Sequence, residues 1–137
     1  MADAYIDAQD ITDAMIERLV RSFYSRISQD ERLGPIFVEA IGTDWEPHLL
    51  RMIDFWSSLM LRTGRYSGSP LRKHTALVGV TPDDFQVWLR LFNESALAIC
   101  GERTAPKFME RAERIAQSFQ MAMFYDPSEH GPTATQP

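Results

Sequence analysis

The stretch WEPHLLRMIDFWSSLML, residues 45–61, decides the fold class of this chain. Its apolar side chains recur every three or four positions, which is the period of an α-helix with one buried face. His48, Met52 and Phe55 follow i, i+4, i+7 spacing and therefore share one side of that helix. The full predicted inward face is Trp45, His48, Leu49, Met52, Phe55, Trp56, Leu59 and Met60. The stretch therefore predicts a long amphipathic helix that turns a histidine toward the core.

Three further segments show the same helical period. The first spans about residues 13–28 and the last about residues 105–124. Between them, TPDD at residues 81–84 begins a third long helix with a cap, a first-turn proline and two carboxylates, and Gly101 is expected to end it. The predicted inward residues are Ile16, Leu19, Val20, Phe23, Ile27, Phe85, Trp88, Leu89, Phe92, Ala96, Ile99, Phe108, Ala112, Ile115, Ala116, Phe119 and Met123, with Tyr24 on a flank. Since strand signals are nearly absent, the sequence predicts an all-α domain with four main helices.

The first two long helices are joined by a segment with an internal glycine and proline. Gly34-Pro35 is expected to break any regular helix there. The remainder is expected to form a helical turn that presents Ile36 and Phe37 inward.

A loop and a short helix separate the second long helix from the third. The loop, RTGRYSGSP, spans residues 62–70, and Ser69-Pro70 at its end predicts a capped helix start. The short helix that follows carries His74.

Length and composition bound the class of protein. The chain has 137 residues, the size of one domain, which is expected to span residues 1–126. The polar, proline-containing tail of residues 127–137 is expected to be disordered. A net charge of −5 argues against nucleic-acid binding, and no apolar run approaches the roughly 18 residues of a membrane span.

The termini and the cysteine content favour a cytoplasmic protein. The N-terminus MADAYIDAQD is acidic and lacks the basic and apolar regions of a signal peptide. Cys100 is the only cysteine, so no internal disulfide can form. Its place at an apolar helix end predicts a buried, unreactive thiol.

Several common catalytic constellations do not fit the sequence. No glutamate precedes a histidine by three positions, as a di-iron carboxylate bundle requires, and no paired-ligand spacing suits zinc. Neither GxGxxG nor GxxxxGK occurs. What remains is His48 and His74, and each could be either a core histidine with its ring hydrogen-bonded or a ligand of a bound cofactor.

Three blocks in order carry a resemblance to a known family: RSFYSRISQDERLGPIF, WEPHLLRMIDFWSSLMLRTGRYSGSPLRKH and FQVWLRLFNESA. With these blocks, the chain resembles the truncated haemoglobins of the third group over nearly all of residues 12–125. The glycine-pair motifs of the first two groups are missing, which is a mark of the third. The resemblance implies a two-over-two helical sandwich in which the helix before the proximal histidine is mostly loop.

The resemblance also implies a site that holds haem b. His74 matches the proximal iron ligand, and Arg72 and Lys73 beside it are candidates for pairing with the haem propionates. His48 matches the distal histidine, which could contact the ligand, swing outward or bind the iron directly as a second axial ligand. The other matching positions in the distal pocket and against the porphyrin are Tyr24, Phe37, Met52, Phe55, Trp56 and Trp88.

The implied function is binding of O2, NO, CO or similar small ligands, either for oxygen carriage or for redox chemistry on nitric oxide or peroxide. Redox turnover would need a separate reductase, because the chain has no flavin or nicotinamide motif. Three alternatives stay open: a haem-based sensor or interaction module, a low-potential electron-transfer protein with bis-histidine iron, and a cofactor-free helical bundle. The oligomeric state is not predicted.

Overall fold

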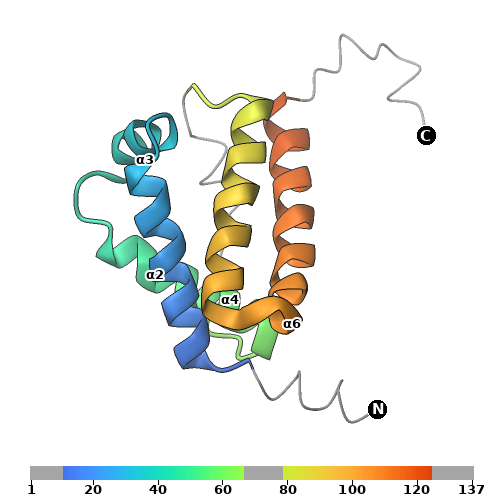
Figure 1. Ribbon diagram of the computed structural model, residues 1–137. Helices are drawn as coiled ribbons and strands as arrows, with labels where there is room; N and C mark the ends of the chain where they lie inside the picture. Colours follow the sequence, from blue (N-terminus) through green and yellow to red (C-terminus); the bar gives the residue numbers. More distant parts are fainter. Residues whose placement is uncertain (1–10, 67–78, 125–137) are drawn as a thin grey trace.

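The computed structural model describes residues 11–66 and 79–124, and in these ranges all regular structure is helical. The helices are α2 (Asp13–Gln29), α3 (Leu33–Ile41), α4 (Glu46–Leu61) and α6 (Pro82–Phe124) (Figure 1). The prediction of an all-α chain is therefore confirmed. The predicted short helix with Arg72, Lys73 and His74, and the predicted tail of residues 127–137, lie outside the described residues, so the proposed domain limits stay a prediction.

α6 consists of two helices that meet at Gly101. This glycine has φ 84° and ψ 170°, a backbone conformation that residues with a Cβ rarely adopt. Figure 1 shows the two parts lying side by side as a helical hairpin, with the turn at this position. The predicted end of the third helix at Gly101 is confirmed, while the next helix starts directly after it rather than near residue 105.

The helices form the expected two-over-two sandwich. α2 packs against α3, α4 and α6 and is the central element of the core. α4 reaches the hairpin of α6 through Trp56, whose ring stacks on Phe92 with centroids 5.2 Å apart. Buried side chains of α2, α3, α4 and α6 form the main core cluster, which includes the predicted stripe of α2 and also Tyr24. Phe85, Ala116 and Phe119 of α6 form a second, smaller cluster. None of the described helices is long and apolar enough to cross a lipid bilayer.

The prediction that Gly34-Pro35 breaks the helix was wrong. Both residues lie in the first turn of α3, where a proline is tolerated because the first four N–H groups have no partner within the helix. Gly34 is buried, and a Cβ built on it would lie 2.8 Å from the carbonyl oxygen of Ser28. The glycine therefore lets the start of α3 pack against the end of α2. Phe37 is buried and Ile36 packs against the core, as predicted.

Cys100 is half-buried, which is less than predicted. Burial raises the pKa of its thiol to about 11, although the charge of Arg18 acts in the opposite direction. The thiol is thus protonated near neutral pH, and the expectation of an unreactive cysteine stays a prediction.

Candidate functional site

A tyrosine from α2 and a histidine from α4 meet in the interior. The Tyr24 hydroxyl oxygen and His48 Nε2 lie 3.0 Å apart, and the two rings make an edge contact with centroids 5.0 Å apart. Tyr24 is 5% exposed and His48 is 9% exposed. Burial raises the pKa of Tyr24, so the phenol keeps its proton. The Tyr24 O–H donates to Nε2 when the imidazole carries its own proton on Nδ1. When that proton is on Nε2, the imidazole donates to the tyrosine oxygen and the phenol O–H is free for another acceptor.

Aromatic rings hold Tyr24 in place. Phe37 of α3 and Trp45, the residue before α4, each lie with ring centroids 6.2 Å from Tyr24. The Trp45 indole N–H donates to the carbonyl oxygen of Gly42 over 2.6 Å. The sequence places Trp45 on the inner face of its helix, but nothing in the spacing shows that it supports the tyrosine.

Trp88 stands in the first part of α6 and faces the same region. Its ring makes an edge contact with Phe23 at 5.5 Å and stacks on Phe92 at 6.2 Å. It is half-buried, so one part of the indole is packed and another part borders open space. Trp88 therefore forms a wall between the core of the sandwich and the cavities beside it.

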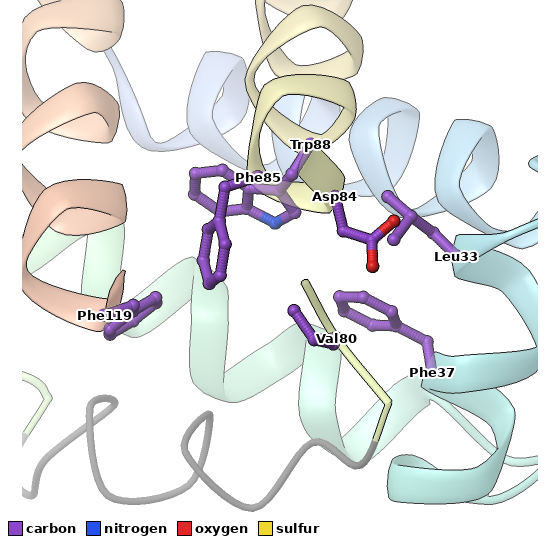
Figure 2. A pocket seen from close by; sticks show the side chains of 7 residues that line it. All are labelled: Leu33, Phe37, Val80, Asp84, Phe85, Trp88 and Phe119. Carbon is purple, nitrogen blue, oxygen red and sulfur yellow. The ribbon is translucent and has the colours of Figure 1, made fainter. Parts of the chain in front are cut away.

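Two small cavities border Trp88, and each measures about 20 Å³. Figure 2 shows the first, which Phe37 and Phe119 border from opposite sides. Its lining is Leu33, Phe37, Val80, Asp84, Phe85, Trp88 and Phe119. The second is lined by Phe23, Tyr24, Met52, Phe55, Trp56, Trp88, Ile115 and Phe119. Trp88 and Phe119 line both cavities.

The structure brings most of the predicted distal residues together. Tyr24, Met52, Phe55, Trp56 and Trp88 line the second cavity, while Phe37 and Trp88 line the first. His48 reaches the second cavity through Tyr24 and does not itself line it. Arg72, Lys73 and His74 lie outside the described residues, so their roles stay predictions.

Asp84 is a cavity residue that sequence reasoning missed. It is 5% exposed and accepts hydrogen bonds from Arg32 Nε at 2.9 Å and Arg32 Nη2 at 3.0 Å. The backbone N–H of Thr81 donates to the same carboxylate at 2.9 Å. This is the capping-box bond in which the side chain of the third helical residue accepts from the backbone of the capping residue. The sequence marks Asp84 only as a helix-start carboxylate, because nothing local signals a partner 52 residues away.

This ion pair connects two walls of the first cavity. Burial by itself raises the pKa of Asp84, but the hydrogen bonds from Arg32 and Thr81 outweigh it and hold the pKa below its usual range. Arg32 also donates to the carbonyl oxygen of Gly79 at 2.7 Å. The start of α3 and the start of α6 are thereby fixed relative to each other.

The chemistry of the lining suits a flat, largely apolar ligand with one polar contact region. Aromatic and methionine side chains supply the surface, and the Tyr24 hydroxyl supplies a buried hydrogen-bond donor. Cavities of about 20 Å³ hold about one water molecule each. A porphyrin is larger than either cavity.

Comparison with known proteins gives consistent matches. The family model of the bacterial-like globins matches residues 11–125. The group 3 truncated hemoglobin Ctb of Campylobacter jejuni is 35% identical over 119 residues, which cover 85% of this chain and 94% of that protein. The crystal structure of group III truncated hemoglobin from Campylobacter jejuni is similar in fold, with a TM-score of 0.79. That structural match has 36% identity and covers 84% of this chain and 93% of the other.

Proposed function

Since the chain belongs to the bacterial-like globins, and within them to the group III truncated haemoglobins, we propose that it binds haem b and uses it to hold O2 and other small diatomic ligands. Family membership implies a haem-binding globin, and the type of haem and the ligand are the proposal. In this proposal His74 is the proximal iron ligand, and Arg72 and Lys73 pair with the propionates. When bound, haem supplies the iron chemistry of ligand binding and electron transfer.

The observation that carries the proposal is the contact between Tyr24 and His48 beside an apolar cavity. A buried, protonated phenol is a hydrogen-bond donor that water does not compete for. When His48 Nε2 carries the imidazole proton it donates to the tyrosine oxygen, and the phenol O–H is free to donate to a diatomic ligand that gains partial negative charge in the second cavity. The indole N–H of Trp88, at the wall of the same cavity, is the second proposed donor.

His48 is proposed to orient the Tyr24 hydroxyl rather than to bind iron at rest. Its Nε2 lies 3.0 Å from the tyrosine oxygen, so binding of this nitrogen to a metal would break that contact. The bis-histidine alternative therefore has to overcome a buried interaction of roughly 1 kcal/mol. This cost favours the ligand-binding function over the low-potential electron-transfer alternative.

Two or more donors near the ligand favour tight retention over delivery of oxygen. Each is worth roughly 0.5–1.5 kcal/mol, and 1.4 kcal/mol changes an equilibrium tenfold. We therefore propose redox chemistry on nitric oxide or peroxide, with electrons from a separate reductase, ahead of oxygen transport. The cytoplasmic location expected from the sequence stays a prediction that cell fractionation would test.

Absorption spectroscopy of the haem-reconstituted protein tests the proposal. Ferric and ferrous spectra are recorded for the wild type and for His74→Ala, His48→Ala and His130→Ala. The His130 change is the matched control, since this histidine has no proposed role. We expect only His74→Ala to remove the proximal-ligand signature. A ferrous form that loses an axial ligand in His48→Ala would favour bis-histidine coordination, and a wild type that takes up no haem would contradict the proposal.

A further inference from the structure

An ion pair connects α2 and α4 close to the contact between Tyr24 and His48. Arg21 Nη1 donates to Glu46 Oε1 at 2.9 Å, and Arg21 Nη2 donates to Glu46 Oε2 at 2.8 Å. The third guanidinium nitrogen, Nε, donates to Glu17 Oε2 at 3.0 Å on the same helix. Parallel bonds from one guanidinium to both oxygens of a carboxylate fix orientation as well as distance. Glu46, at the start of α4, is therefore held in a defined position relative to α2.

The pair and the buried contact are neighbours along both helices. Arg21 precedes Tyr24 by three residues, about one turn of α2, so the two side chains lie on related faces. Glu46 is the first residue of α4 and precedes His48 by two. The first turn of α4 is thus joined to α2 by an ionic contact at its start and by a buried one at His48.

The first turn of α4 has little internal support. Trp45 at its N-cap makes no side-chain capping bond, and the first four N–H groups of a helix have no partner within it. Such a turn frays unless other contacts hold it. Here the backbone N–H of Glu46 is 3.3 Å from Asp44 Oδ1, a long hydrogen bond. Contacts with α2 therefore help to hold the residues of this turn.

We propose that Arg21 and Glu46 are positioning residues, whose ion pair docks the first turn of α4 onto α2 and so keeps His48 against Tyr24. This inference rests on the proposed function, because the Tyr24–His48 contact affects ligand binding only if the cavity beside Tyr24 holds the ligand. Both charged side chains are partly exposed, with relative exposures of 38% and 52%. An exposed pair of good geometry shifts an equilibrium by only about two- to fivefold. We expect a shift of that size in the fraction of molecules with His48 displaced.

Nuclear magnetic resonance of the histidine ring nitrogens measures that fraction in the ferrous, carbon monoxide-bound protein, which is diamagnetic. The test variants are Arg21→Gln and Glu46→Gln. Glu17→Gln is the matched control, because it removes the other partner of Arg21 and leaves the bridge to α4 in place. Both test variants are expected to shift the His48 signals toward the displaced state by about two- to fivefold. The control is expected to leave them unchanged.

Salt provides a second measurement on the unaltered chain. Raising the ionic strength from about 0.15 M to about 1 M screens exposed charges and should displace His48 in the wild type. The same salt series should have no such effect in Glu46→Gln. A role of Glu46 that does not depend on its charge does not predict this difference. If one of the two test variants fails to fold, the same salt series on the other still decides.

The outcomes separate this proposal from the proposed function. His48 signals that are unchanged in folded Arg21→Gln and Glu46→Gln overturn it, as does an equal effect of Glu17→Gln. The rate of carbon monoxide binding is measured in parallel. If the His48 signals respond and this rate does not, the positioning role stands, and the proposed place of His48 and Tyr24 at the ligand fails.

Discussion

The Tyr24 hydroxyl and His48 Nε2 lie 3.0 Å apart although 24 residues separate them in the chain. The contact joins α2 to α4 in the core, and Tyr24 also lines a cavity. A single hydroxyl thus meets a fixed partner on one side and open space on the other. With the imidazole proton on Nε2, His48 donates to the tyrosine oxygen and holds the phenol in place, and the phenol's own O–H is then available to a ligand.

Replacement of Tyr24 by phenylalanine tests that donor. Tyr24→Phe keeps the ring contacts and removes the O–H, so we expect oxygen to dissociate from the haem-reconstituted protein roughly tenfold faster. Tyr66→Phe is the matched control, because Tyr66 packs on Phe55 and lines neither cavity. Stopped-flow measurement of oxygen release is the readout. Equal rates in Tyr24→Phe and the wild type would contradict the role of the hydroxyl.

Trp88→Phe tests the second proposed donor. The substitution keeps an aromatic ring next to Phe23 and Phe92 but removes the indole N–H. We expect oxygen release to accelerate severalfold, because the bound ligand loses one hydrogen bond of roughly 0.5–1.5 kcal/mol. The double variant with Tyr24→Phe shows whether the donors act on the same ligand, since coupled donors give a non-additive effect. An unaltered rate in the single variant would assign Trp88 to packing alone.

The ion pair of Arg32 and Asp84 is expected to make stability depend on pH. The pKa of Asp84 in the folded protein lies below its usual value, so the pair stabilises the fold fully above about pH 4. That contribution is lost as the pH falls through the folded pKa. Asp84→Asn should lower the free energy of unfolding by about 1–3 kcal/mol near neutral pH, because Arg32 loses its charged partner.

Urea unfolding at about pH 7 and at about pH 3 measures this dependence. The gap between wild type and Asp84→Asn should narrow at the lower pH, where the carboxylate is being protonated. Asp83→Asn is the control, since its side chain is exposed in the same helix turn. A gap of the same size at both pH values would show that the charge of Asp84 is not what stabilises the fold.

Gly34→Ala tests the close approach of α3 to α2. A Cβ at this position lies 2.8 Å from a backbone oxygen of Ser28, and backbone yields less easily than a side chain. We expect a loss of about 1–3 kcal/mol in the free energy of unfolding. Pro35→Ala, at an exposed neighbouring position, should change it by less than about 1 kcal/mol. Thermal or urea unfolding checks both, and an unchanged stability in Gly34→Ala would contradict the packing argument.

The sequence by itself determined the four long helices and their inner faces. Periodicity is a local property, so the stripe on α2 from Ile16 to Ile27 and the break at Gly101 could be predicted from neighbouring residues alone. The Gly34-Pro35 prediction was wrong for a physical reason. Proline breaks a helix only where its missing N–H is needed, and the first turn does not need it.

Only the tertiary structure decided which side chains meet. Family resemblance proposed Tyr24 and His48 as distal residues, but their 3.0 Å contact follows from how α2 crosses α4. The pairing of Arg32 with Asp84 spans 52 residues and leaves no trace in local spacing. Hydrogen bonds and ion pairs act over a few ångströms in space, whereas helical periodicity acts over a few residues in sequence. The helices could therefore be predicted from the chain, while the partners of their polar side chains depended on the packing of one helix against another.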